Sequence, residues 1–459
     1  MPTSPTTLSL PVRARTPLPG LALCVLLASF GASSANVALP ALQRAFGTGF
    51  AAVQWIVLAY LLAATAAAVG AGRLGDMIGR RRVLLGGIAL FAAASGLCAL
   101  APTLALLVAA RALQGLGAAV MLALGMALAA ASLPQGRTGS AMGLLGSMSA
   151  VGTALGPALG GLLLAGPGWR AVFAATLPGA ALALALVRRV PDDAAGGTSA
   201  PRPPFDLAGL LLLVAALLAF AVAATGACPL PRGWLFGASL LAAALFVRAE
   251  ARAAAPLVPL VLLRDRVLAS SFAMSALAMG LMMTTMLVGP FYLGRALGLA
   301  PGAVGLTLAA GPLVAALTGV PAGRLVDRRG ARAVAAKGIA AMALGSGLLA
   351  LTPPWAGVAG WIVPLAVLTA GYALFQAANN TAVMDVAGGA RRGVAAGLLN
   401  LARQLGLIAG SALLGTVFAS HPRGTPLEVA AATHATFALA TLLPLLALGA
   451  AWLGRKARG

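Results

Sequence analysis

The sequence predicts an all-α polytopic membrane protein with two homologous six-helix bundles and two additional central helices. Three observations lead to this fold class. Of 459 residues, 61% are hydrophobic and 9% are charged, and the mean hydropathy is +0.98. The apolar residues form runs of about 20, the length that spans a bilayer, and the two ends of the chain repeat each other. Because soluble domains carry about 25% charged residues, a soluble enzyme, a disordered chain and a secreted disulfide scaffold are excluded.

Fourteen runs are long and apolar enough to form spanning helices. We interpret the first as a retained helix, because its apolar run continues through Pro40 without a convincing small-residue cleavage site. The eighth is the shortest, and the third and fourth are joined by a tight turn at Pro102. The runs are 19–41, 51–71, 83–101, 103–131, 140–165, 170–187, 207–227, 234–248, 268–292, 302–322, 333–352, 358–384, 393–419 and 432–453.

The positive charge of the chain is distributed asymmetrically. There are 31 Lys and Arg against 9 Asp and Glu, a net charge of +22, which in a soluble protein would suggest nucleic-acid binding. With the N-terminus in the cytoplasm, 24 basic residues fall in cytoplasmic segments and 5 outside, while Arg111 and Arg403 lie within spans. This follows the positive-inside rule. We therefore expect a multi-pass protein of the bacterial plasma membrane with both termini cytoplasmic and with no nucleic-acid partner.

An internal repeat organises the chain. Segments 72–82 and 323–332 agree at six positions with an offset of 251, and six residues from Arg137 to Gly161 match the thirteenth span with an offset of 254. Such agreement indicates two parallel repeats, which is the plan of a transporter with a site at the midplane. The predicted organisation is a cytoplasmic tail (1–18), an N-terminal six-helix bundle (19–190), a cytoplasmic linker (191–206), two additional spans (207–248), a second linker (249–266), a C-terminal six-helix bundle (267–454) and a cytoplasmic tail (455–459).

Several motifs, in this order along the chain, resemble the major facilitator superfamily and its fourteen-helix drug:proton antiporter branch. The matching segments are Gly72–Arg82, Arg111–Gly115 and Gly152–Gly161, which resemble the signatures of the helix 2–3 connection, helix 4 and helix 5, and Asn36–Pro40, Trp55–Tyr60 and Trp169–Gly179, which look like that branch. The resemblance covers nearly the whole chain. It implies the major facilitator fold and export of small amphipathic compounds by alternating access, coupled to proton influx.

Two other kinds of function are the alternatives to proton-coupled export. A specific metabolite exporter or an uptake transporter would belong to the same superfamily, although the glycine–proline pair of the fifth span argues against uptake. A membrane enzyme would need a catalytic cluster at one depth, and a receptor would need a sizeable soluble domain; the sequence offers neither. We expect a monomer without metal or cofactor, whose partners are a small-molecule substrate, the proton and the lipid bilayer.

Four residues are candidates for a conformational latch: Gly72, Asp76, Arg80 and Asp327. Glycine allows a tight turn in the predicted loop, and Asp76 can pair with Arg80 or meet the positive end of a helix. The resemblance implies a latch that holds the cytoplasmic side closed and breaks during the cycle. The alternative is a topology determinant combined with a turn.

The fifth span carries the antiporter motif. Gly152, Gly156 and Gly160 recur every four residues and form one smooth face, on which helix backbones can approach closely. Pro157 adds a bend, and Gly161 completes the motif. The resemblance implies a close contact between the two halves that prevents leak, and ordinary packing by small residues is the alternative.

Coupling candidates are Arg111, Gln114 and Arg403. An arginine inside the bilayer costs roughly 2.5–3.5 kcal/mol on insertion scales, so it should face protein or water. Arg111 and Gln114 share a helical stripe with Met121, which we interpret as a cavity-facing line. The resemblance gives Arg111 a role in proton coupling or substrate response. A structural hydrogen-bond donor is the alternative for both arginines.

Further polar and thioether residues are candidates for a substrate cavity: Ser33, Asn36, Met121, Met282, Met286, Tyr372, Gln376, Asn379 and Asn400. Tyr372, Gln376, Asn379 and Asn380 form a polar stripe on the twelfth span. Because bare amides are costly in lipid, this stripe could form a substrate wall or an interhelical polar clamp. Methionines suit promiscuous apolar sites but also serve in packing. Ser33 and Asn36 could line the cavity or bond to helix carbonyls.

The sequence departs from the family pattern at Gly31, where many members of this branch have an acidic residue in helix 1. None of the nine acids lies clearly within the membrane core, so the sequence offers no carboxylate there as the proton carrier. A buried cationic ligand needs a carboxylate partner. We therefore expect a neutral or weakly acidic amphipathic substrate more readily than a lipophilic dication.

Overall fold

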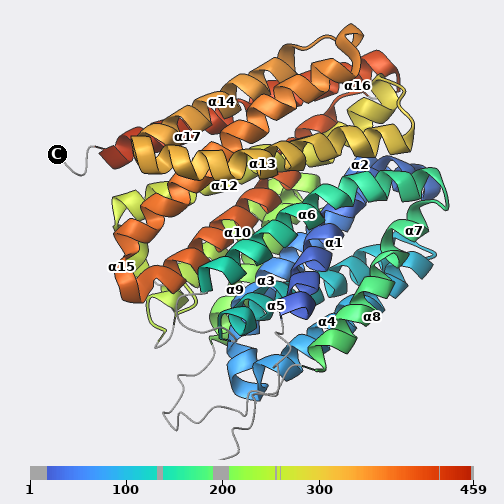
Figure 1. Ribbon diagram of the computed structural model, residues 1–459. Helices are drawn as coiled ribbons and strands as arrows, with labels where there is room; N and C mark the ends of the chain where they lie inside the picture. The colour runs from blue at the N-terminus through green and yellow to red at the C-terminus, as the bar shows by residue number, and fades with distance from the viewer. Residues whose placement is uncertain are drawn as a thin grey trace, which may run out of the picture.

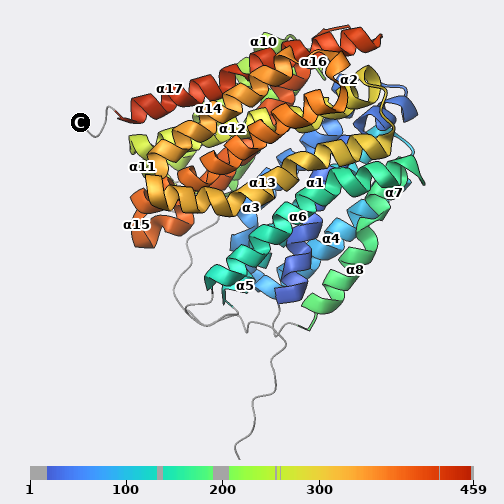
Figure 2. The same ribbon diagram turned by 45° about the horizontal axis from the view of Figure 1, so that its top comes forward.

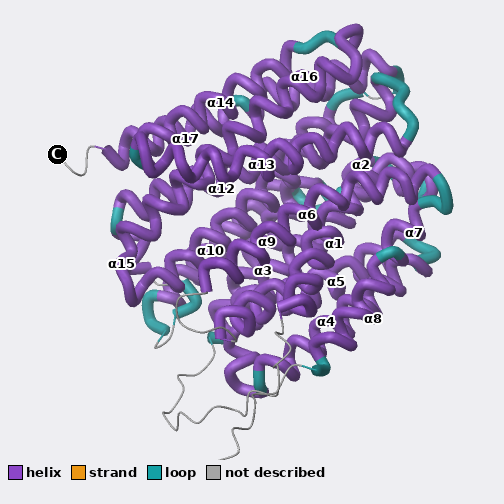
Figure 3. Tube along the Cα trace, viewed as in Figure 1, coloured by secondary structure: helices purple, strands orange, loops and turns teal. Residues whose placement is uncertain are grey.

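The computed structural model describes residues 18–131, 138–189, 206–253, 256–258, 260–422 and 424–455, and every regular element in these ranges is a helix. Fourteen helical segments within them are long and apolar enough to cross a membrane. The helices lie side by side in one block, and the connecting turns gather at its two ends (Figure 1, Figure 3). The predicted set of fourteen spans, including the short eighth, is confirmed.

The first half is built around its first helix, which packs against α5, α6 and α8. Leu21, Leu39 and Leu42 of this helix are fully buried. The predicted second and sixth spans are each divided by one residue. The elements are α1 (Leu18–Ala45), α2 (Phe50–Val53), α3 (Trp55–Ile78), α4 (Arg80–Leu100), α5 (Leu104–Ala131), α6 (Thr138–Ala165), α7 (Trp169–Ala174) and α8 (Thr176–Val187).

The two additional helices, α9 (Leu207–Thr225) and α10 (Arg232–Glu250), pack mainly on each other. The Asp206 carboxylate caps α9 by accepting from the Gly209 N–H at 2.7 Å. Helix α9 also contacts α3 and α15, so it touches both halves. Most of α10 is exposed, as expected for a helix at a lipid-facing surface.

The second half repeats the architecture of the first, with α12 in the place of α1 and packed against α15 and α17. It occupies the yellow-to-red part of the block, beside the blue-to-green first half (Figure 1, Figure 2). Its elements are α11 (Leu260–Arg264), α12 (Arg266–Phe291), the π-helix η1 (Tyr292–Ala296), α13 (Pro301–Arg329), α14 (Ala331–Leu351), the 3₁₀ turn η2 (Pro354–Ala356), α15 (Gly357–Ser420), α16 (Pro426–Ala440) and α17 (Leu442–Arg455).

The structure corrects the predicted loop from Gly72 to Arg82. Helix α3 continues to Ile78 and α4 begins at Arg80, so only Gly79 leaves the helical conformation, with φ of +107°. The second half repeats this turn at Gly330, with φ of +79°, between α13 and α14. A positive φ favours glycine. These two glycines are 251 residues apart, as in the sequence repeat, and they mark what we call the basic end of the block.

A second correction concerns the twelfth and thirteenth spans. They belong to one helix, α15, which continues through residues 385–392, where the sequence predicts a loop. The other end of the block, called the opposite end here, holds the turns 46–49, 166–168 and 297–300. Most of the predicted first tail and of the linker 191–206, together with residues 456–459, lies outside the described residues.

Candidate functional site

The glycine motif of α6 is divided between two partners. A Cβ on Gly156 would lie 2.8 Å from the Ser33 Cβ, and one on Gly160 would lie 2.9 Å from the Val37 Cγ1. Gly152 likewise approaches the backbone of α1. The predicted smooth face therefore packs within the first half, against α1. The implied contact between the halves is not made by this face.

Gly161, at the end of the motif, makes the contact between the halves. A Cβ on it would lie 2.6 Å from the Pro301 carbonyl oxygen and 2.8 Å from the Gly305 Cα of α13. Gly305 in turn meets the Pro157 carbonyl oxygen. Helices α6 and α13 lie side by side here (Figure 1, Figure 2). Only glycine on both helices permits this approach. We call this contact between Gly161 and Gly305 the glycine crossing, and it lies in the half of the block near the opposite end.

A second crossing joins the halves at the position that the internal repeat relates to the first, and this one includes a hydrogen bond. Gln54, fully buried before α3, donates from Nε2 to the Ser411 carbonyl oxygen of α15 and lies against Gly415. The repeat offsets of 251 and 254 relate Gln54 to Gly305, Ser411 to Pro157 and Gly415 to Gly161. The fold therefore builds the same crossing twice, once from two glycines and once from a glycine and a hydrogen-bonded amide.

Aromatic and polar contacts complete the junction at the opposite end. The rings of Phe50, Phe291 and Phe418 form one cluster, with centroids 5.0–5.8 Å apart. Arg295 of η1 donates to the Gln43 Oε1 of α1 at 3.0 Å. Phe50 joins the first half to Phe291 and Phe418 of the second, and Gln43 joins it to Arg295, so the halves are tightly closed against each other at this end.

The Gln54 crossing leads to a first prediction. Replacing Gln54 by Met keeps the volume but removes the donor to the Ser411 carbonyl oxygen, at a cost of about 1 kcal/mol. We expect a lower apparent melting temperature of the purified protein. Gln404→Met on α15 is the matched control. The Oε1 atoms of Gln54 and Gln404 are both buried without a hydrogen-bond partner among the described residues, and only the Gln54 substitution removes the bond to the Ser411 carbonyl oxygen. Equal melting temperatures for wild type and Gln54→Met would contradict this role.

Arg111 is enclosed inside the first half. It is fully buried, and its guanidinium donates to the Ile56 carbonyl oxygen (3.1 Å), to the Gly31 carbonyl oxygen (3.0 Å) and to the Gln114 side chain. It also lies 4.3 Å from the centroid of the Tyr60 ring. No carboxylate is among these partners, and Nη2 has no hydrogen-bond partner among the described residues. Carbonyl dipoles and an aromatic face hold this charge.

The predicted stripe on α5 therefore faces protein and not a cavity. The hydrogen-bond network continues from Gln114, which donates from Nε2 to the Ser95 hydroxyl at 2.7 Å. Ser95 in turn donates to the Phe91 carbonyl oxygen. Met121 is also fully buried. The cavity-facing line that the sequence predicts for Arg111, Gln114 and Met121 is not seen here, because all three side chains are buried against neighbouring helices. Periodicity defines a face of a helix but not its neighbour.

Part of the α15 stripe is half-buried and beside the α12 methionines. Tyr372 donates from its hydroxyl to the Met279 sulfur at 3.0 Å and accepts from Gln376 Nε2 at 3.0 Å. Arg403 donates to the Asn380 Oδ1. Met282 and Met286 are half-buried too. This half-buried set combines hydrogen-bond donors, an aromatic ring and thioethers, the groups that orient an amphipathic ligand.

Other cavity candidates lie elsewhere. Asn379 is buried and donates to the Ser271 carbonyl oxygen and the Ser275 hydroxyl of α12, so it clamps two helices together. Ser33 and Asn36 are buried and bond to carbonyls of their own helix. Asn400 is exposed. For Ser33, Asn36 and Asn379 the structure favours the structural alternatives that the sequence left open.

The latch residues lie at the basic end. Gly72 is in α3, Arg80 begins α4, and Asp327 is exposed in the last turn of α13. The side chain of Asp76 lies outside the described residues. Their latch function stays a prediction. The described acids Asp206, Asp265 and Glu428 cap helices α9, α12 and α16, which accounts for three of the few carboxylates.

Sequence reasoning missed Gly305, Gln54 and Ser411 as contact residues between the halves. The repeat alignment held a signal for them, because each is the repeat equivalent of another residue at a crossing. The missing information was which helices of the two halves meet.

The fold and its crossings define a multi-pass membrane transporter with two six-helix bundles that meet at one end, a plan built on parallel repeats. The sequence matches the family described as Major Facilitator Superfamily over residues 21–411 and 268–459. The chain belongs to this superfamily.

Three curated relatives illustrate the match. The chain is 32% identical to "Multidrug resistance protein Stp" of Mycobacterium tuberculosis, covering 84% of this chain and 72% of the relative. It is 34% identical to "Drug efflux pump JefA" of the same organism, covering 84% and 76%. It is 32% identical to the "Probable actinorhodin transporter" of Streptomyces coelicolor, covering 83% and 68%. The protein is thus a transporter with drug-efflux relatives, and not an enzyme.

Solved structures share the fold. A bacterial homologue of the human lysosomal transporter Spinster, in an inward-facing and unoccupied conformation, aligns with a TM-score of 0.71 at 15% identity, over 97% of this chain and 98% of that one. The nucleoside transporter NupG aligns with a TM-score of 0.68 at 14% identity, over 95% and 99%. At these identities the likeness concerns the fold alone.

Proposed function

We propose that the protein exports small amphipathic compounds by alternating access, driven by proton influx across the bacterial plasma membrane, with both termini cytoplasmic. The observation that carries the proposal is the pair of relatives named for multidrug resistance and drug efflux, each covering 84% of this chain. In this account the basic end faces the cytoplasm. The opposite end, closed at the Gly161–Gly305 and Gln54–Ser411 crossings, faces outward.

The closed opposite end supports an inward-facing assignment. A transporter must seal one side while the other admits its substrate, and the glycine crossing provides a seal without side chains that need to rearrange. During the cycle, the two crossings would separate together, and the basic end would close.

Substrate recognition is assigned to the half-buried set around Tyr372, Gln376 and Arg403, with Met282 and Met286. The polar groups orient the ligand, and the thioethers adapt to different apolar shapes. The charged member of this set is an arginine, so a neutral or weakly acidic amphiphile suits it better than a dication. For proton coupling, Arg111 and Gln114 are the proposed elements, because their network joins α1, α3, α4 and α5.

Specific metabolite export is the second candidate. It is favoured by the relative named as a probable actinorhodin transporter. A multidrug exporter would respond to several unrelated compounds, whereas a specific exporter would respond to one class.

The direct test is a pH-gradient assay in inverted vesicles that contain the wild-type protein, over a panel of neutral, weakly acidic and dicationic amphiphiles. We expect several neutral or weakly acidic compounds to dissipate the gradient, and vesicles without the protein not to respond. If no compound dissipates the gradient, proton-coupled export is wrong. A response confined to dications would overturn the assigned substrate class.

A further inference from the structure

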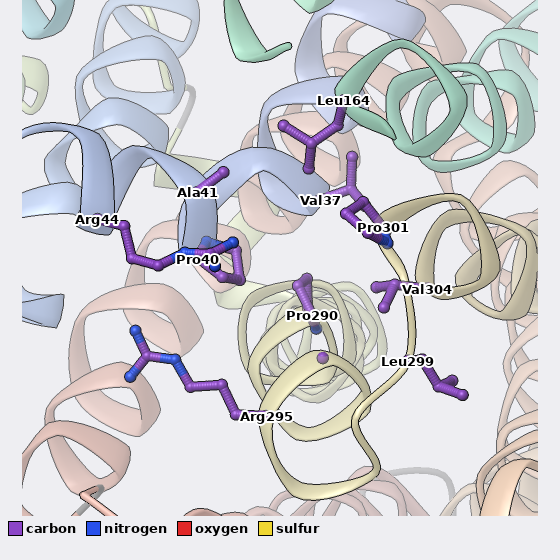
Figure 4. A pocket seen from close by; sticks show the side chains of 11 residues that line it. Val37, Pro40, Ala41, Arg44, Leu164, Pro290, Arg295, Leu299, Pro301 and Val304 are labelled. Atoms are coloured by element: carbon purple, nitrogen blue, oxygen red, sulfur yellow. The ribbon is translucent and has the colours of Figure 1, made fainter. Parts of the chain in front are cut away.

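A cavity of about 190 Å³ lies between the two halves at the opposite end (Figure 4). Its walls come from α1 and α6 of the first half and from the end of α12, η1 and the start of α13 of the second. Most of the lining is apolar, including Pro40, Leu164, Leu299 and Val304. Two arginines, one from each half, are its charged lining residues.

Arg44, exposed in the last turn of α1, and Arg295, half-buried in η1, line the same margin of the cavity, one from each half (Figure 4). Both side chains are positively charged, and like charges repel each other. Arg295 donates to the Gln43 Oε1 at 3.0 Å and lies 5.6 Å from the Phe291 ring centroid. Neither arginine forms an ion pair with a carboxylate among the described residues. The junction thus brings together two like charges without an acid.

A third positive group points to the same place. Helix α13 is 29 residues long and begins at Pro301, which lines the cavity. Its N-cap residue, Ala300, has no side chain that can accept from the first amides. The N-terminus of a helix carries a partial positive charge that attracts anions. The α13 residues that line the cavity add charge and no free N–H, because Pro301 has none and the Val304 N–H donates to the Ala300 carbonyl oxygen at 3.0 Å. The uncapped helix end and the two arginines therefore create a field that favours an anion.

We propose that this cavity binds a phosphate-type oxyanion, which bridges Arg44 and Arg295 and holds the two halves together at the opposite end. Charge-assisted hydrogen bonds from guanidinium to phosphate are strong and often bidentate. The anion replaces the repulsion between the two arginines by two attractions. Because the two arginines belong to different halves, the site is complete only while this end is closed. The proposal goes beyond the export function and does not depend on the exported compound.

The phosphate group could come from inorganic phosphate or from the headgroup of an anionic phospholipid. A headgroup is compatible with the apolar walls and with the position of the cavity at the ends of spanning helices. Both sources offer the same phosphate oxygens to the arginines. They differ in whether binding requires the acyl chains of a phospholipid. The experiment separates them.

The test measures thermal unfolding of the purified full-length protein by tryptophan fluorescence. One arm adds sodium phosphate at constant ionic strength to the protein in neutral detergent. The other compares nanodiscs of phosphatidylcholine with nanodiscs that also contain phosphatidylglycerol. The variants are Arg44→Gln and Arg295→Gln. The control is Arg232→Gln, which removes an exposed arginine at the start of α10 that does not line the cavity.

We expect at least one arm to raise the melting temperature of wild type and of Arg232→Gln by about 3 °C at saturation. The rise should be lost in Arg44→Gln and Arg295→Gln. A rise with phosphate indicates a free anion, and a rise only with phosphatidylglycerol indicates a lipid headgroup. Without either ligand, Arg44→Gln should melt no lower than wild type, because it removes a repulsion. No rise in either arm, or an equal rise in all variants, overturns the proposal.

Discussion

Replacing Gly161 by Ala is expected to reduce transport by about tenfold or more. The new Cβ would lie 2.6 Å from the Pro301 carbonyl oxygen and 2.8 Å from the Gly305 Cα, which are backbone atoms that cannot rotate away. Overpacking of this kind typically costs 1–3 kcal/mol. Because the crossing exists only while the opposite end is closed, the cost falls on one state of the cycle, and 1.4 kcal/mol changes a two-state equilibrium about tenfold. The pH-gradient assay in inverted vesicles measures the loss.

The matched control for this substitution is Gly146→Ala on the same helix, since a Cβ there would meet nothing within 4 Å. Its transport should stay within a factor of about two of wild type. Gly305→Ala approaches the same crossing from α13 and should reproduce the Gly161→Ala defect. Expression and melting of each variant show whether the protein is folded. If both Gly161→Ala and Gly305→Ala transport at the wild-type rate, the crossing has no role in the transport cycle.

Replacing Arg111 by Lys is expected to have the second largest effect. Lysine keeps the charge, but a single ammonium cannot reach the Ile56 and Gly31 carbonyl oxygens and the Gln114 side chain together in the geometry of the guanidinium fork. Hydrogen bonds to a charged group contribute about 1.5–3 kcal/mol each. We expect the stability to fall by about 3 kcal/mol and the transport to fall more than tenfold, measured by thermal unfolding and by the pH-gradient assay.

Arg403→Lys is the control for Arg111→Lys. Arg403 is half-buried and donates to one side chain, Asn380, so lysine can replace it at a smaller cost in stability. A structural role of Arg111 alone would lower stability and transport in parallel. A coupling role would leave substrate binding intact in the Arg111→Lys protein while proton movement is lost. Unchanged stability in Arg111→Lys would show that the buried network does not hold α5 in place.

Much of the fold follows from hydropathy and repetition alone. All fourteen spans were predictable, because each needs its own stretch of apolar residues. The turn at Gly79 was located only to within a loop, since Arg80, Arg81 and Arg82 look like a solvated connection although they begin α4. The same reasoning failed at residues 385–392 of α15. Charged residues at a membrane surface do not indicate whether the backbone there is helical.

The contact residues were less predictable, for a different physical reason. The four-residue spacing of Gly152, Gly156 and Gly160 correctly predicted a smooth face, but the spacing does not name the helix that covers it. The covering helix is α1, and the contact between the halves falls to Gly161, one position away. Likewise, the stripe with Arg111 was recognised as one face of a helix, but its burial depends on Tyr60 and the neighbouring helices. Such pairings are long-range, and local periodicity does not encode them.

The central claim is that the two halves meet at the opposite end in one state and separate there when substrate is exported. Double electron–electron resonance measures this directly, with spin labels at Ala45 and Leu427 for the opposite end and at Met77 and Ala333 for the basic end, all exposed positions. Cys24, Cys98 and Cys228 are first replaced, and transport is verified. When a transported compound is added, we expect the Ala45–Leu427 distance to lengthen while the Met77–Ala333 distance shortens. If neither distance changes with a compound that is transported, alternating access at these crossings is wrong.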